Sequence, residues 1–88
     1  MRVKIIHQLI KNGVKDGSTS HYPKAEELLK ECNESLKDFR PIDAEDYKIL
    51  TIYRDIQFMK KVFNAPIEYD TLEKGYYYYG KNFTLSLE

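Results

Sequence analysis

The 88-residue sequence contains a single cysteine and two histidines. One cysteine excludes an internal disulfide framework, and together with two histidines it gives too few soft ligands for a structural zinc site. No uninterrupted apolar run approaches the length of a membrane span. The first residues lack the apolar core and small-residue cleavage site of a signal peptide, so a reducing, cytoplasmic location is expected.

The chain also lacks an overall charge, because 14 basic side chains balance 14 acidic ones. A net basic composition, the usual signal for nucleic-acid binding, is therefore missing. The distribution is uneven, since residues 1–24 carry five basic side chains against one acidic side chain. Residues 25–40 and 65–88 are each acidic on balance. Any contact with nucleic acid would depend on a local basic patch.

Motifs for catalysis are missing as well. The sequence has no phosphate-cradling glycine loop, no nucleophile elbow and no histidine–carboxylate spacing of a metalloenzyme. Its acidic residues are spread along helical and linker segments, where a solvated surface explains them. We therefore expect no catalytic residues, no metal and no cofactor, and a protein that is not an enzyme.

What the sequence does contain is helical periodicity of apolar residues. The first predicted helix runs from Val3 to Asn12 and stops before Gly13. His7 lies at the margin of its apolar stripe and is interpreted as a half-buried packing residue. The segment Val14–Tyr22 is rich in glycine, serine and threonine and is predicted to be a polar loop.

The second predicted helix begins at Pro23, because the missing N–H of proline costs nothing at the first helical position. Cys32 lies on the apolar stripe of this helix and is interpreted as a small core residue rather than a reactive thiol. The helical pattern breaks over residues 33–42. Within this break Pro41 should keep Arg40 extended, since a residue before proline avoids the α region.

The third predicted helix has a single buried stripe, formed by Ile49, Ile52, Ile56, Met59 and Phe63. Its start is open. Asp43 could be the N-cap with Asp46 in a capping-box position, or residues 43–47 could form a separate turn before a helix that starts near Lys48. Asn64 closes the helix, and Pro66 prevents its continuation. Four residues stand opposite the stripe: Leu50, Arg54, Gln57 and Lys61.

Two β-prone runs follow, Ile67–Tyr69 and Tyr76–Tyr79, joined by the loop Thr71–Gly75 with its glycine at the end. Alternation places Tyr76 and Tyr78 on one side of the second strand, and Tyr77 and Tyr79 on the other. One pair is expected to pack on the third helix. The other pair should contact Ile67 or Tyr69 across the strands, in preference to stacking on nucleic-acid bases.

The segment Phe83–Leu85 either adds a short final strand or packs on the core. Three helices followed by a β-hairpin form the α+β layout of a winged helix-turn-helix.

Three motifs occur in order within this layout: Thr51-Ile52-Tyr53-Arg54-Asp55-Ile56, Ala65-Pro66-Ile67-Glu68-Tyr69-Asp70 and Gly75-Tyr76-Tyr77-Tyr78. They resemble the recognition helix T-I-x-R-D-I and the strands a-P-I-x-Y-D and G-Y-x-Y of the N-terminal winged helix-turn-helix in WYL-domain transcriptional regulators. The resemblance covers about residues 51–85, and residues 3–32 only in pattern. Two features depart from the family. Lys48, Ile49 and Leu50 replace the usual serine and arginine before the threonine, and the connection to the third helix is long.

The resemblance implies the DNA-binding domain of a transcriptional regulator, with the third helix in the major groove of double-stranded DNA and the hairpin on the backbone or minor groove. Thr51 can donate its hydroxyl to a phosphate, and Arg54 can pair with a phosphate or bind guanine bidentately. Asp55 is expected to be structural. The alternative to a DNA contact for Arg54 is a surface ion pair with Asp55 or with a glutamate of the second predicted helix. The expected DNA contacts are Lys48, Thr51, Arg54, Gln57, Lys61 and Lys74.

A second interpretation remains open, in which the winged helix contacts another protein through Leu50, Phe58 and the tyrosine face. The neutral charge favours it. Members of the resembled family usually carry a further WYL domain that senses a ligand. Residues 1–86 are therefore expected to be one domain of a longer regulator that dimerises through other regions. The final Leu87-Glu88 resembles the pair that many expression vectors leave before an affinity tag.

Overall fold

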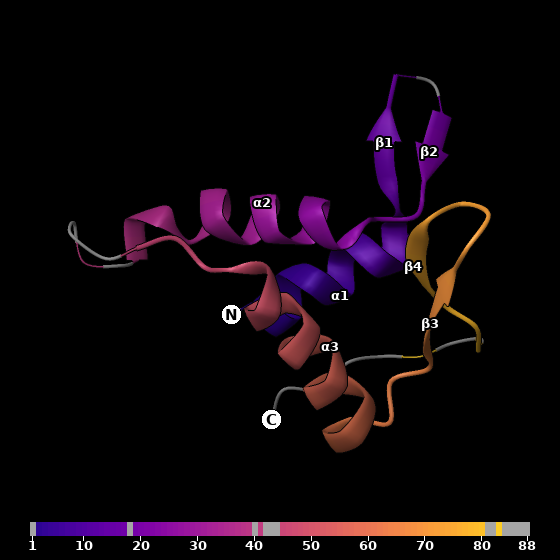
Figure 1. Cartoon of the computed structure of the whole chain (residues 1–88). Coiled ribbons are helices and arrows are strands. Elements are labelled where there is room, and N and C mark those ends of the chain that lie inside the picture. The colour runs from indigo at the N-terminus through magenta and orange to yellow at the C-terminus, as the bar shows by residue number, and fades with distance from the viewer. Residues whose placement is uncertain (1, 18, 40, 42–44, 81–82, 84–88) are drawn as a thin grey trace.

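The computed structural model describes residues 2–17, 19–39, 41, 45–80 and 83. Figure 1 shows the order of the elements, which are α1 (Arg2–Asn12), β1 (Val14–Asp16), β2 (Thr19–His21), α2 (Ala25–Ser35), a 3₁₀ turn η1 (Lys37–Phe39), α3 (Ile49–Val62), β3 (Ile67–Asp70) and β4 (Gly75–Tyr78). The predicted α+β class, with three helices followed by an antiparallel hairpin, is confirmed for this part of the chain. None of the described helices has the length and apolar character needed to cross a bilayer.

The three α-helices enclose one apolar core. Each contributes residues at helical spacing, as the sequence predicted: Ile6 and Ile10 from α1, Leu28 and Cys32 from α2, and Ile52, Ile56 and Met59 from α3. Cys32 is fully buried, so its interpretation as a core residue is confirmed. Burial raises the pKa of its thiol to about 11, because the interior disfavours the thiolate.

The prediction of a polar loop over Val14–Tyr22 is wrong. Strands β1 and β2 pair there as an antiparallel hairpin, with Val14 opposite His21 and residue 16 opposite Thr19. Gly17 follows β1 with a φ of 67°, a conformation that glycine adopts without steric cost. In Figure 1 this hairpin projects from the helical body beside strand β4.

Helix α2 begins two residues later than predicted, with Ala25 as its first residue and Lys24 as its N-cap. The Lys24 N–H donates a hydrogen bond of 2.9 Å to Glu27 Oε1. Pro23 therefore lies outside the helix, where its carbonyl accepts a hydrogen bond of 2.8 Å from the Tyr76 N–H. The helix continues to Ser35, so the predicted break at residue 33 is too early. Arg40, whose extended conformation was predicted, lies outside the described residues.

Helix α3 begins at Ile49 with Lys48 as its N-cap, which confirms the alternative of a start near Lys48. Asp43, the other candidate N-cap, lies outside the described residues. The helix ends at Val62, and Asn64 follows in the left-handed region with a φ of 55°, as expected of the residue that closes it.

Strands β3 and β4 pair antiparallel, with Ile67 opposite Tyr78 and Tyr69 opposite Tyr76. Directly opposed residues share one face of a sheet. Tyr76 and Tyr78 therefore contact the opposing strand and also pack on the core. The predicted division of these two roles between the tyrosine pairs is wrong.

His7 of α1 is half-buried, as predicted, and its Nδ1 lies 2.8 Å from the Tyr78 hydroxyl. Burial and the nearby Lys11 lower the pKa of His7, and burial raises the pKa of Tyr78 to about 12. Phe83 packs on the core beside both rings, which agrees with one of the two expectations for this segment. Residues 84–85 lie outside the described residues.

The loop between β3 and β4 is held by Asp70, whose Oδ1 accepts hydrogen bonds from the N–H groups of Leu72 and Glu73 at 2.8 and 3.0 Å. The left-handed residue of this loop is Lys74, with a φ of 57°, rather than the glycine that follows it. Gly75 is required for another reason. A Cβ there would lie closer than 3.0 Å to the backbone carbonyl of Tyr22.

Candidate nucleic-acid interface

Helix α3 has one face in the core and the opposite face in solvent. The four residues predicted to stand opposite the buried stripe, Leu50, Arg54, Gln57 and Lys61, are all exposed. Among the other expected DNA contacts, Lys48 is exposed just before the helix, and Thr51 is half-buried at the border of the stripe. Lys74 is exposed in the β3–β4 loop. The structure therefore gathers Arg54, Gln57 and Lys61 on one face.

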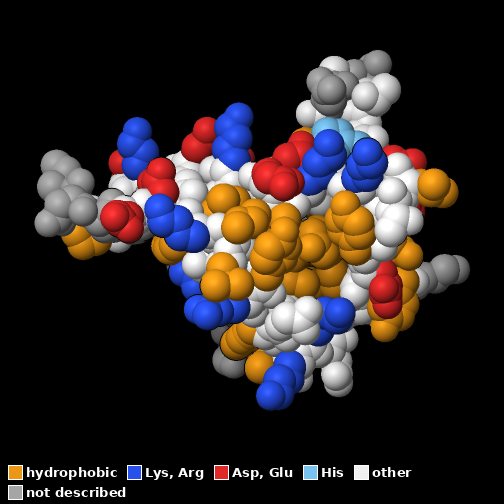
Figure 2. All heavy atoms as spheres, viewed as in Figure 1, with side chains coloured by type: hydrophobic (Ala, Val, Ile, Leu, Met, Phe, Trp, Pro, Cys, Tyr) orange, Lys and Arg blue, Asp and Glu red, His pale blue; other side chains and the backbone are white. Residues whose placement is uncertain are grey.

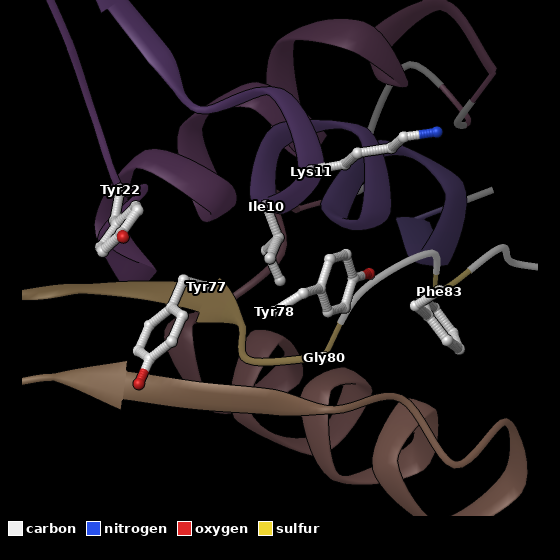
Figure 3. A pocket seen from close by; sticks show the side chains of 7 residues that line it. All are labelled: Ile10, Lys11, Tyr22, Tyr77, Tyr78, Gly80 and Phe83. Carbon is white, nitrogen blue, oxygen red and sulfur yellow. The ribbon is translucent and has the colours of Figure 1, made fainter.

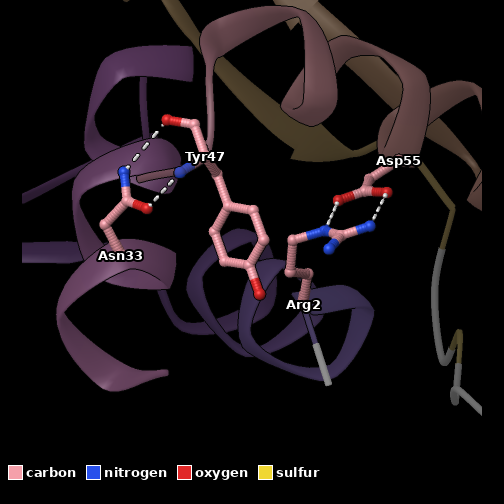
Figure 4. Close-up of polar contacts among 4 residues, drawn as sticks. All are labelled: Arg2, Asn33, Tyr47 and Asp55. Atoms are coloured by element: carbon pink, nitrogen blue, oxygen red, sulfur yellow. Dashed lines mark hydrogen bonds and ion pairs between the residues drawn. The ribbon is translucent and has the colours of Figure 1, made fainter. Parts of the chain in front are cut away.

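Asp55 is the one buried charged residue in the described part of the chain, and it is bound by Arg2 of α1. Arg2 Nε donates to Asp55 Oδ2 at 2.7 Å, and Arg2 Nη2 lies 3.4 Å from Oδ1 (Figure 4). These hydrogen bonds raise the pKa of Arg2, although burial opposes the shift. The expectation that Asp55 is structural is confirmed, because its carboxylate binds the arginine of another helix.

The segment before α3 is fixed by contacts with α1 and α2. The Arg2 guanidinium carbon lies 4.7 Å from the centre of the Tyr47 ring, within the range of a cation–π contact. The Tyr47 N–H donates to Asn33 Oδ1 at 2.7 Å, and Asn33 Nδ2 donates to the Tyr47 carbonyl at 3.3 Å (Figure 4). Together with the Arg2–Asp55 pair, these contacts set the start and the rotation of α3.

The Arg54 side chain is not paired with the adjacent Asp55, because Asp55 is bound by Arg2. The alternative interpretation paired Arg54 with Asp55 or with a glutamate of α2. Neither pair occurs among the residues that the structure describes, where the only carboxylate salt bridges are Arg2–Asp55 and His21–Glu27.

A groove lies between α3 and the β3–β4 hairpin, and we call it the tyrosine groove after Tyr53, Tyr69 and Tyr76, which line both of its halves. The narrower half, of about 260 Å³, also contacts Gln57, Lys60 and Glu68. The wider half, of about 530 Å³, extends to Lys24, Ala25, Glu26 and Lys74. Figure 2 shows hydrophobic side chains gathered in the middle of this face, with both acidic and basic side chains above them and basic side chains below.

Sequence reasoning missed most of this groove. Lys74 and Gln57 were expected contacts, but Tyr53, Tyr69 and Lys24 were not. Tyr53 and Tyr69 are 44% and 49% exposed, and Tyr69 meets the half-buried Tyr76 edge to face, with ring centres 5.1 Å apart. Burial and then the nearby Tyr53 and Tyr69 raise the pKa of Tyr76. The available signal for the groove was Tyr53, the exposed aromatic residue at the x position of the T-I-x-R-D-I motif.

A separate cavity of about 440 Å³ lies between α1, β4 and Phe83 (Figure 3). Tyr22 and Tyr77 stack at one end of it, with ring centres 5.1 Å apart, and Lys11 is its only charged lining residue among those described. None of the residues expected to contact DNA lines this cavity.

Among the described residues, no group of three or more histidine, cysteine, aspartate or glutamate side chains could hold a metal ion. No protein-family model, curated protein or solved structure matches the chain.

Proposed function

We propose that this chain is the DNA-binding domain of a transcriptional regulator, folded as a winged helix-turn-helix. In this proposal α3 enters the major groove of double-stranded DNA, and the β3–β4 hairpin is the wing on the adjacent backbone or minor groove. The resemblance to WYL-domain regulators supports the same function.

One observation carries the proposal. The only acidic residue of α3, Asp55, is turned inward to Arg2, while Arg54, Gln57 and Lys61 face solvent together. The outward face therefore carries only neutral and positive side chains, which suits the approach of phosphates. The 14 residues of α3 span about 21 Å, and a helix of this kind fits the major groove.

The roles of the side chains follow from their chemistry. Arg54 binds guanine O6 and N7 or a phosphate, and Gln57 binds adenine or a phosphate. Lys48, Lys61 and the half-buried Thr51 contact phosphates at the two ends of α3. Lys74 contacts the backbone from the hairpin loop.

The direct test is fluorescence anisotropy of a labelled mixed-sequence duplex titrated with the protein at low and moderate salt. Binding should weaken steeply with salt, because bound lysine and arginine release counterions from the duplex. Arg54→Ala should weaken binding about tenfold or more. The matched control is Lys37→Ala, an exposed cation of η1 at the far end of α2, which should bind as the unmodified protein does. Absence of binding at low salt, or indifference to salt, would refute the function, and an unchanged affinity of Arg54→Ala would refute the site.

A second candidate function is contact with another protein through the same helix. The observation in its favour is the exposure of large apolar side chains on α3, since Leu50, Phe58 and Val62 are 53%, 42% and 61% exposed. Leu50→Lys separates the two functions. If α3 faces DNA, the added charge on its free face should tighten duplex binding at low salt. If α3 faces a protein, duplex binding should be absent in both proteins, or equal in the variant and the unmodified protein.

A further inference from the structure

We infer that the wider half of the tyrosine groove binds one phosphate of the DNA backbone, with Lys24 and Lys74 supplying positive charge and the hydroxyls of Tyr53 and Tyr69 supplying hydrogen bonds. This inference rests on the proposed function, because it names the part of the duplex that the groove receives.

The lining of the cavity comes from separate parts of the chain that meet at one place. Lys24 precedes α2, Tyr53 lies on α3, Tyr69 lies on β3, and Lys74 ends the β3–β4 loop. All four line one cavity of about 530 Å³. A phosphodiester offers only acceptors and a negative charge, so ammonium and hydroxyl donors are the groups that bind it.

The charges in this half of the groove favour an anion. Lys24 and Lys74 stand against a single carboxylate, Glu26. The next carboxylate, Glu27, is engaged with His21, at 2.8 Å, and with the Lys24 N–H, at 2.9 Å. Within the described part of the chain, neither lysine forms a salt bridge. Lys74 is therefore available to a ligand, and Lys24 lies near enough to Glu27 for their charges to interact as well.

The backbone brings the two lysines together although they are far apart in sequence. The Tyr76 N–H donates to the Pro23 carbonyl at 2.8 Å, directly beside Lys24 and two residues after Lys74. Gly75 allows this approach, because any Cβ there would collide with the Tyr22 carbonyl. The left-handed conformation of Lys74 sets the end of the loop at the same point. The site is thus held by main-chain contacts before a ligand arrives.

The arrangement of the rings favours a phosphate over a stacked base. Tyr69 and Tyr76 meet at an interplanar angle of 67°, so the edge of one ring covers a face of the other. A base needs an open aromatic face, whereas a phosphate needs only hydroxyl groups at the rim. The narrower half of the groove reaches Gln57 of α3. The bound phosphate would therefore be next to the base pairs that α3 reads.

The test compares the affinity of a mixed-sequence duplex across a salt series for four proteins. These are the unmodified chain, the double variant Lys24→Gln/Lys74→Gln, the variant Tyr53→Phe, and the control Lys4→Gln/Lys37→Gln, in which two exposed lysines on α1 and η1 lose the same charge. Thermal unfolding of each variant checks that the fold is kept.

Loss of one phosphate contact should lower the slope of log affinity against log salt by about 0.9. At 0.1 M salt this corresponds to about an eightfold loss of affinity for the double variant. Tyr53→Phe should lose about tenfold, because it removes a hydrogen bond to a charged phosphate, and the slope should be unchanged because the lost hydroxyl carries no charge. The control should keep both the slope and the affinity of the unmodified chain.

If the unmodified chain binds DNA but the groove variants behave as the control does, the inference is overturned and the proposed function stands. If the unmodified chain binds no duplex, the proposed function fails and the inference fails with it. A parallel titration with inorganic phosphate and a mononucleotide, followed by tyrosine ring NMR signals, identifies the source of the phosphate. Binding of these small anions without duplex binding would assign the groove to a free phosphate compound and would overturn the DNA-backbone inference.

Discussion

The ion pair between Arg2 and Asp55 should be asymmetric in what each partner contributes to stability. Removing one partner of a buried pair lowers the free energy of unfolding mainly by the cost of leaving the other group without a partner or water. The Asp55 side chain is 12% exposed and that of Arg2 is 34% exposed. Arg2 can therefore turn toward water when Asp55 is lost, whereas Asp55 stays buried when Arg2 is lost.

These exposures set the expected magnitudes. Breaking a fully buried pair costs about 3–5 kcal/mol, and the partial exposure of Arg2 places Arg2→Gln near the lower end, at about 3 kcal/mol. Asp55→Asn keeps the shape and leaves an arginine that reaches solvent, so it should cost about 1.5 kcal/mol. The double variant contains no unpaired buried carboxylate. Its cost should therefore fall short of the sum of the two single costs by about 1 kcal/mol or more.

Urea unfolding followed by far-UV circular dichroism measures these differences, with a constant slope against denaturant as the check that the transition is comparable. Arg54→Gln, on the neighbouring exposed position, is the matched control and should stay within about 0.5 kcal/mol of the unmodified protein. If Asp55→Asn costs as much as Arg2→Gln, or if the two costs add, rehydration of Arg2 does not explain the energetics of this pair.

Three further outcomes follow from buried groups. Gly75→Ala should destabilise the protein by about 1–3 kcal/mol in the same urea assay, because its Cβ collides with the Tyr22 backbone; a neutral effect would contradict this close approach. Cys32, with its pKa near 11, should resist a thiol reagent at pH 8, where about a thousandth of it would be thiolate, and should react fully in urea. Equal reaction rates with and without urea would show that the thiol is not buried. The pKa of His7 is lowered in the folded state, so the unfolded state binds the proton more readily, and the free energy of unfolding should fall as pH drops below the usual value of 6.5. In His7→Gln this fall should be smaller. An identical fall in the variant would exclude His7 as its source.

The helices could be predicted because apolar spacing records the face that each one buries. Ile6, Leu28 and Ile52 occupy such stripes, and all three are fully buried. The start of α3 could not be chosen, because Asp43 and Lys48 both offered a plausible beginning. Capping preference is a local signal, and the position of the start also depends on how Tyr47 is bound by Asn33 of α2.

The β1–β2 hairpin could not be predicted from periodicity. Its strands have three residues each, and they carry no alternation of apolar and polar side chains. The one available signal was the dipeptide Gly17-Ser18, which is typical of a two-residue hairpin loop. The abundance of serine and threonine around it favoured a loop instead. A hairpin this short is marginal by itself, and the stacking of Tyr22 on Tyr77 supports it from outside.

The candidate contacts could be predicted on α3 and at the hairpin loop residue Lys74, but the groove that joins them to Lys24 could not. Arg54, Gln57 and Lys61 share a face by helical spacing alone, so their exposure could be foreseen. The wider half of the tyrosine groove joins Lys24 to Lys74 through a main-chain hydrogen bond between Pro23 and Tyr76. Contacts between residues so distant in sequence depend on tertiary packing, for which a single sequence offers no local pattern.

The adjacent arginine and aspartate of the motif Thr51–Ile56 have opposite environments for a geometric reason. Successive helical residues are turned by about 100°, so Arg54 faces solvent when Asp55 faces the protein. Asp55 then needs a cation, and Arg2 of α1 supplies it. If α3 binds DNA as proposed, this pair also keeps an uncompensated carboxylate away from the phosphates. Arg2→Gln should therefore weaken duplex binding in the anisotropy titration under conditions in which the variant remains folded, although Arg2 is not among the proposed DNA contacts.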